Sequence, residues 1–124
     1  MSFASRGAET YRQQQVQSCN PIELVVLLYD GALQSLDAAR AAIERRDIRA
    51  RQEATNRALS IIAELQCTLD MTRGGEIAAS LDRLYSYANL RLLEATMNDD
   101  VAPVEEVQKL FGILRDGWNQ VAKG

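Results

Sequence analysis

The stretch NPIELVVLLYDGAL, from Asn20 to Leu33, decides the fold because it is compatible with two structures. An apolar run followed by an Asp-Gly pair is typical of a strand that ends in a hairpin turn. The apolar residues instead recur in alternating steps of three and four, at Ile22, Val25, Tyr29, Ala32, Leu36, Ala39 and Ile43. This spacing places them in one stripe along a helix, and it predicts a helix rather than a strand.

The start of this helix is marked by three residues. Asn20 is a favourable N-cap, Pro21 suits the first helical position, and Glu23 stands where the acid of a capping box belongs. Gly31 therefore lies inside the helix, where glycine costs up to about 1 kcal/mol relative to alanine. A glycine at such a position indicates the close approach of a second helix or a required gap.

Three further stretches repeat the helical periodicity. Asp47 is a suitable N-cap for a second helix that is expected to reach about Asp70, where the glycines of RGG (73–75) end it. A third helix is expected over residues 76–97, and a fourth from about Pro103.

The predicted fold is all-α, an antiparallel up-down four-helix bundle that forms a single domain over residues 20–124. The connections between the helices are short, which favours antiparallel neighbours. Residues 1–19 are expected to form an N-terminal arm or short helix, because the polar stretch ETYRQQQVQSCN (9–20) offers only Tyr11 and Val16 as large apolar anchors.

Composition excludes several classes of function. The chain has 124 residues, of which 47% are hydrophobic and 25% charged, as expected of one globular domain. The net charge of -3 argues against nucleic acid as a partner. No apolar run is long enough to insert into a membrane, and the first residues lack the apolar core of a signal peptide. A soluble, cytoplasmic protein is therefore expected.

The chain contains no histidine, which removes many catalytic arrangements. Nucleophilic Ser-His and Cys-His pairs, Glu-x-x-His di-iron bundles and His-containing zinc sites are all excluded. Cys19 and Cys67 are far apart and share no metal-binding spacing. No catalytic residue, metal site or cofactor is expected. An open alternative is a small helical enzyme that uses carboxylates such as Glu64 and Asp70 with a divalent metal.

The first helix has more apolar residues than one buried stripe requires. If Ile22, Val25 and Tyr29 face the core, Leu24 and Leu28 are left for another surface. They either widen the core or lie under the arm, or they form an exposed patch that binds another chain. The third helix has a similar surplus beside its main stripe, at Tyr85, Tyr87, Leu90 and Leu93. Such surfaces favour a partner helix bound in a groove, or a homodimer of this chain.

Several motifs, in a fixed order, resemble the FliS family of flagellar export chaperones. Tyr11 and Val16 precede Asn20-Pro21-x-x-Leu24-Val25, which leads into Leu28-Tyr29-Asp30-Gly31-Ala32. The later motifs are Ala58-x-x-Ile61-Ile62-x-x-Leu65-x-x-x-Leu69-Asp70, then Gly74-Gly75-Glu76-Ile77-Ala78-x-x-Leu81-x-x-Leu84-Tyr85-x-Tyr87, and finally Leu114-Arg115-x-Gly117-Trp118. The resemblance covers nearly the whole chain.

The resemblance implies a cytoplasmic chaperone that holds the disordered C-terminal segment of flagellin. It prevents premature polymerisation and delivers flagellin to the export gate, the membrane protein FlhA. In such a protein, the N-terminal arm can cover the apolar site while flagellin is absent. Matching motif positions imply a partner-binding site made of Tyr11, Val16, Leu24, Leu28, Ile62, Leu65 and Tyr85.

Overall fold

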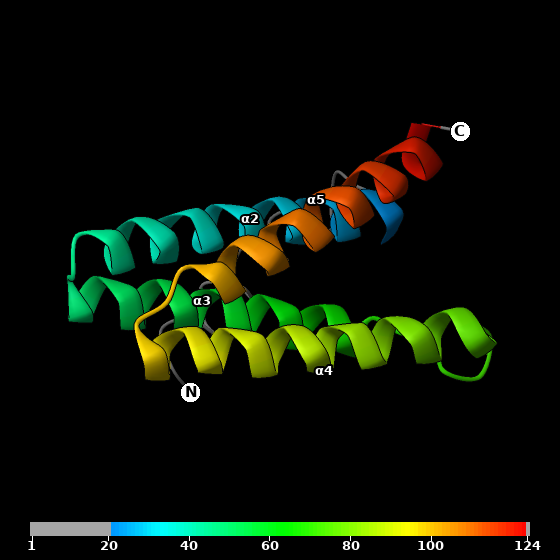
Figure 1. Ribbon diagram of the computed structural model, residues 1–124. Helices are drawn as coiled ribbons and strands as arrows, with labels where there is room; N and C mark the ends of the chain where they lie inside the picture. Colours follow the sequence, from blue (N-terminus) through cyan, green and yellow to red (C-terminus); the bar gives the residue numbers. More distant parts are fainter. Residues whose placement is uncertain (1–20, 124) are drawn as a thin grey trace.

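The computed structural model describes residues 21–123, which form four long helices (Figure 1). They are α2 (Pro21–Glu44), α3 (Ile48–Cys67), α4 (Gly75–Asn98) and α5 (Ala102–Lys123). Successive helices run in opposite directions, so the predicted all-α, up-down bundle is confirmed. The expected arm and the N-cap residue Asn20 lie outside the described residues.

The four helices surround one interior, and each contacts two neighbours. α2 packs against α3 and α5, and α4 packs against the same two helices from the other side. α2 and α4 are therefore diagonal to each other, as are α3 and α5. Each helix directs one face to the shared core, which contains large side chains from all four helices: Leu28, Tyr29, Leu36, Ile62, Leu65, Tyr85, Leu92, Val104, Val107 and Phe111.

Gly31 allows α2 and α3 to pack closely. A Cβ built on this residue would lie 3.3 Å from Cδ1 of Ile61 in α3. The glycine therefore marks a close approach between helices, as its position inside α2 indicated. It also identifies the face of α2 that packs against α3.

The buried face of α2 is wider than one stripe, which corrects the assignment of faces from the sequence. Leu24 and Leu28 are buried, whereas Ile22 and Val25 stay half-buried. The physical reason is that α2 packs against two neighbours. Leu28 and Leu24 precede Gly31 by three and seven residues and share its α3-facing side. Only Tyr29, of the three residues expected in the core here, is completely buried.

The helix ends follow local chemistry, with one difference from expectation. The side chain of Asp47 accepts a hydrogen bond of 3.1 Å from the backbone N–H of Ala50, as expected of an N-cap. However, α3 ends at Cys67, and the Gly74-Gly75 pair stands at the start of α4 instead of closing α3. Gly75 has a φ of +53°, which favours glycine, so the pair turns the chain into α4.

Candidate functional site

Three aromatic rings from three helices meet at the centre of the bundle. The ring of Phe111 in α5 lies 5.2 Å from that of Tyr29 in α2 and 6.1 Å from that of Tyr85 in α4, centroid to centroid. The two tyrosine hydroxyls are 2.6 Å apart and share a buried hydrogen bond. Burial raises the pKa of both tyrosines, so both stay protonated and neutral. We call these residues the aromatic cluster.

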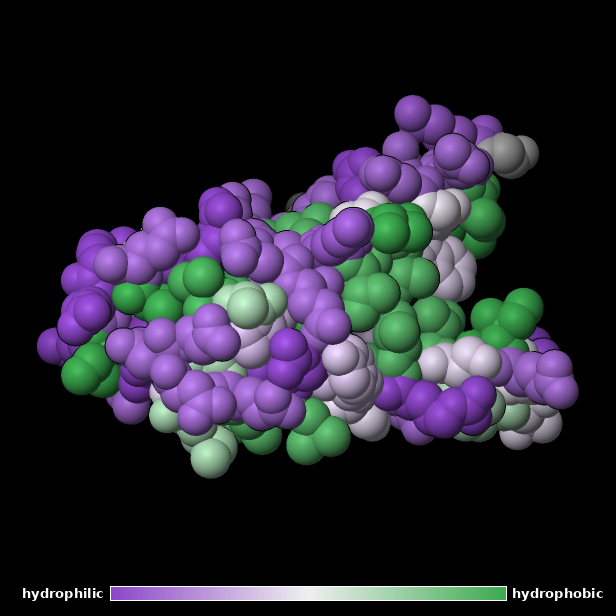
Figure 2. Space-filling model, in the orientation of Figure 1, coloured by the Kyte–Doolittle hydropathy of each residue, from purple (hydrophilic) through white to green (hydrophobic). Residues whose placement is uncertain are grey.

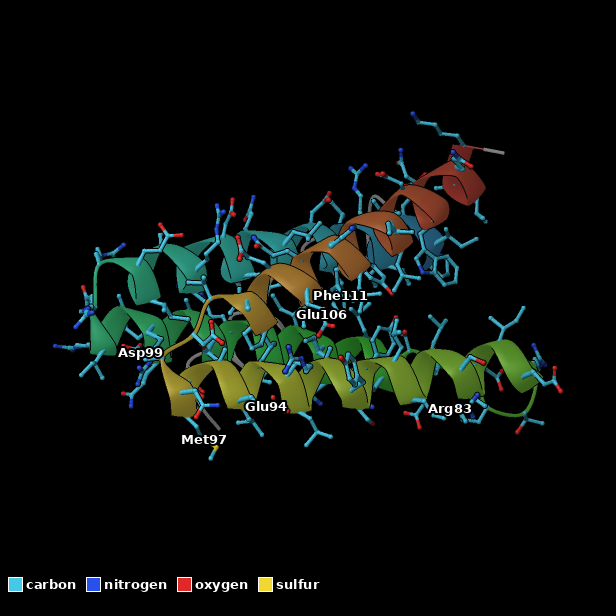
Figure 3. The ribbon with its side chains drawn as sticks, viewed as in Figure 1. Arg83, Glu94, Met97, Asp99, Glu106 and Phe111 are labelled. Atoms are coloured by element: carbon cyan, nitrogen blue, oxygen red, sulfur yellow. The ribbon has the colours of Figure 1, made fainter. Side chains whose placement is uncertain are left out.

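The first part of α5 is fastened to α4 by a polar cluster around Glu106. The Tyr87 hydroxyl donates to the Glu106 carboxylate at 2.9 Å, and Nε of Arg91 donates to it at 2.6 Å. These two donors, Arg91 foremost, lower the pKa of Glu106 and keep it ionised. Figure 3 shows Glu106 on α5 at the side that faces α4.

Beyond this cluster, α5 parts from α4. Figure 1 shows the C-terminal half of α5 rising away from the N-terminal half of α4. The fully buried residues of α5 end at Phe111, so residues 112–123 have no completely buried side chain. The two helices meet at one end of the bundle and are separated at the other.

The diverging half of α5 is held by α2. Nε of Arg115 donates to the carboxylate of Asp30 at 2.8 Å, and both side chains are about one-third exposed. Trp118, further along this half of α5, packs against the hydrophobic core. Burial raises the pKa of Tyr29, and the side chains of Tyr85 and Trp118 act in the opposite direction. Nearer the start of α5, the Gln108 amide donates to Asp37 of α2 at 2.8 Å.

An apolar cleft opens where the two helices part. Figure 2 shows apolar side chains gathered between the diverging half of α5 and the N-terminal half of α4. We define the α4–α5 cleft by the half-buried residues on the inward stripes of the two helices and by one residue at its mouth: Leu81 and Leu84 of α4, Leu110, Leu114 and Trp118 of α5, and Ile77 of α4. Ile77 is 72% exposed, which is unusual for an isoleucine on a core-facing stripe.

Most of the residues predicted to bind a partner lie in the core of the bundle and not on the surface of this cleft. Leu28, Ile62, Leu65 and Tyr85 are at most 1% exposed and belong to the core. Leu24 is 9% exposed. The structure therefore brings four of the seven together in the interior, where they support the walls of the cleft. Tyr11 and Val16 lie outside the described residues, and a binding role for all seven stays a prediction.

Sequence reasoning missed the cleft residues themselves. Leu81, Leu84, Leu114 and Trp118 recur at the helical spacing that is typical of core residues. Nothing in that spacing says that α5 leaves α4 halfway along. Of the four apolar residues expected beside the main stripe of α4, Tyr87, Leu90 and Leu93 are exposed, whereas Tyr85 is buried in the core.

A second apolar surface lies on the outside of α4. Leu90, Leu93 and Met97 follow one another at helical spacing and are 46% to 81% exposed. Figure 3 shows Met97 pointing away from the other helices. Within residues 21–123 no helix covers this outer stripe, which is a flat helix face and not a cleft.

Residues 21–123 contain neither a group of metal-binding side chains nor a helix that could span a membrane. No three histidine, cysteine or acidic side chains in this part of the chain are grouped so that they could hold a metal ion. Within the same residues, none of the helices has the length and apolarity needed to span a bilayer.

The fold and the cleft define a class of protein, a helical bundle with an apolar site between two of its helices. The comparisons with known proteins are consistent with this class. Residues 4–124 match the family described as Flagellar protein FliS. The flagellar secretion chaperone FliS of Salmonella typhimurium is 36% identical, over 97% of this chain and 93% of its own. FliSB of Pseudomonas aeruginosa, also named a flagellar secretion chaperone, is 37% identical over 97% and 98%.

A third relative gives the same result. The flagellar secretion chaperone FliS of Bacillus subtilis is 36% identical over 89% of this chain and 81% of its own. The chain belongs to the FliS family, a family of chaperones and not of enzymes.

Proposed function

We propose that this chain is a cytoplasmic chaperone for flagellin and that the α4–α5 cleft receives the disordered C-terminal segment of flagellin. The observation that supports this most directly is the cleft itself, an apolar opening in a chain whose relatives are named flagellar secretion chaperones. Flagellin held in this way is prevented from polymerising early. It is then delivered to the flagellar export gate through FlhA.

The cleft suits a segment that folds as it binds. A disordered segment loses conformational entropy on binding, so it must bury a large apolar surface in compensation. An amphipathic helix laid between α4 and α5 would cover the half-buried leucines on both walls. The core residues Leu28, Ile62, Leu65 and Tyr85 fix the floor below it, and Leu24 extends the apolar surface along α2.

The predicted arm completes this mechanism. Tyr11 and Val16 would cover apolar surface while flagellin is absent, and they would be displaced when it binds. The arm has few apolar anchors, so displacing it would cost little of the binding energy.

Two matched surface substitutions test the site. Ile77→Glu places a charge at the mouth of the cleft, whereas Leu90→Glu places the same charge on the outer stripe of α4. Both residues are more than half exposed, so both variants should fold. Titration calorimetry with a C-terminal flagellin peptide should show about tenfold or greater weakening for Ile77→Glu, in the range of a lost interface contact. Leu90→Glu should bind as the unchanged chain does.

Equal affinities for all three proteins would overturn the cleft as the binding site. Light scattering of the same mixtures separates the proposal from the alternative of a homodimeric interaction protein. A stable 1:1 complex with the peptide supports the chaperone. A dimer that the peptide leaves unchanged, with no heat of binding, would contradict it.

A further inference from the structure

Two sets of side-chain contacts, one with α4 and one with α2, fix the orientation of α5. Glu106 fastens its first turns to α4 through Tyr87 and Arg91. The far half is fastened to α2 through the ion pair of Arg115 with Asp30, at 2.8 Å, and Trp118 packs against the hydrophobic core one turn further on. The far half of α5 lies apart from α4 because its contacts bind it to α2.

Without the contacts between the far half of α5 and α2, closing the cleft would be favourable. Both walls carry leucines that are only half-buried, at Leu81 and Leu84 on α4 and at Leu114 on α5. Removing these side chains from water by moving α5 onto α4 would lower the free energy of the empty protein. The bundle therefore needs contacts that oppose this closure, and the Asp30–Arg115 pair lies where such a contact is required.

The pair is placed to restrain α5 and not to build the core. Its two side chains are joined across 85 residues of sequence, and both remain about one-third exposed. Neither residue belongs to the hydrophobic core cluster. Their loss should therefore leave the bundle folded while freeing the far half of α5.

We infer that Asp30 and Arg115 are positioning residues that hold the α4–α5 cleft open for the partner segment. The inference rests on the proposed function, since it assigns these two residues a role at that same site. It separates them from the cleft residues, because neither needs to touch flagellin.

The affinity of a C-terminal flagellin peptide for Asp30→Asn, Asp30→Glu and Arg115→Gln tests this role. Asp30→Asn and Arg115→Gln each remove the ion pair, and each should weaken binding about fivefold, the effect that a partly exposed ion pair can supply. Asp30→Glu keeps a carboxylate within reach of Arg115 and should recover most of the lost affinity. The matched control is Asp99→Asn, which removes the carboxylate that pairs with Arg51 at 2.9 Å in another part of the bundle. It should bind the peptide normally.

A distance measurement separates positioning from a general loss of stability. Spin labels on cysteines introduced at Glu76 of α4 and Gln120 of α5, in a chain with Cys19→Ser and Cys67→Ser, report the width of the opening. The mean distance between the labels should shorten in Asp30→Asn without peptide, while the helix content stays the same. The peptide should restore the longer distance.

The outcomes distinguish this inference from the proposed function. If the unchanged chain binds the peptide and all four variants bind it equally well with equal label distances, the inference is wrong and the proposed function stands. If the unchanged chain does not bind the peptide, the proposed function itself fails. A loss of affinity with an unchanged distance would also overturn the positioning role.

Discussion

At the scale of single residues, the aromatic cluster shows how a polar pair is accommodated in an apolar interior. Two tyrosine hydroxyls lie inside the bundle, and one donates a hydrogen bond to the other at 2.6 Å. A buried hydroxyl without a partner costs about 1–3 kcal/mol, so either hydroxyl alone would destabilise the fold. The pair joins α2 to α4, which are diagonal and make no close backbone contact within the described residues.

Replacing Tyr85 with phenylalanine should therefore destabilise the fold by about 1–2 kcal/mol, because Tyr29 loses its hydroxyl partner. The double substitution Tyr29→Phe with Tyr85→Phe should cost less than the sum of the single changes, since no hydroxyl then remains buried. Urea unfolding measures both effects. Tyr87→Phe is the exposed control, and a double variant as costly as the sum would contradict the argument.

The same tyrosines give the pH dependence a definite sign. Burial raises the pKa of Tyr29 and Tyr85 in the folded protein, whereas the tyrosines of the unfolded chain ionise near pH 10. The folded state therefore binds more protons than the unfolded state above that pH, and stability falls as pH rises further. The stability that these residues contribute is fully present below about pH 10. In the double phenylalanine variant, stability should fall less steeply at alkaline pH.

At the scale of helices, periodicity predicted the elements well because it is a local property. The N-cap at Asp47 and the apolar stripe of α2 both depend on residues that are close in the sequence. The sequence therefore predicts both features directly. The role of the glycine pair at 74–75 was assigned to the wrong helix. The place of the glycine pair depends on the turn that the chain makes after Cys67. This turn is tight at Gly74, because an added Cβ there would meet Ala78 and the carbonyl oxygen of Asp70.

A substitution in α5 tests whether its course depends on local flexibility. Gly112 lies inside the helix, and a Cβ added there would meet no atom within 4 Å. Gly112→Ala should therefore stabilise the protein by about 0.5–1 kcal/mol, because alanine loses less backbone entropy in a helix. The melting temperature should rise accordingly.

Gly74→Ala is the contrasting control for this measurement. Its added Cβ would lie 2.6 Å from the Cβ of Ala78 and 2.7 Å from the Asp70 carbonyl oxygen, so it should destabilise the fold. If Gly112→Ala were also destabilising, α5 would need the glycine to follow its diverging path.

At the scale of the whole molecule, the fold was predictable but the cleft was not. Four amphipathic stretches with short connections can hardly form anything but a bundle. Which helices separate depends on contacts between distant residues, such as Asp30 with Arg115, and helical spacing carries no information about these. A family motif likewise does not distinguish a core residue from a surface residue, so it carries no information on the burial of Leu28, Ile62, Leu65 and Tyr85.

The single tryptophan of the chain offers a direct report on the cleft. Trp118 is half-buried on the inner stripe of α5 and packs against the hydrophobic core. A flagellin peptide without tryptophan should shift its fluorescence to shorter wavelength and protect it from acrylamide, because the peptide excludes water from the indole. Ile77→Glu should weaken this response in parallel with the affinity. Tight binding with an unchanged spectrum would place the peptide elsewhere.

The uneven burial of α5 divides this helix into two regions of different local stability. Its completely buried side chains end at Phe111, and residues 112–123 rest mainly on α2. Segments with few buried contacts open at a lower free energy than the whole protein unfolds. The amide hydrogens of residues 112–123 should therefore exchange with solvent through local fraying, while those before Phe111 should wait for global unfolding. One continuous helix would thus belong to two cooperative units, and the boundary between them lies at the aromatic cluster.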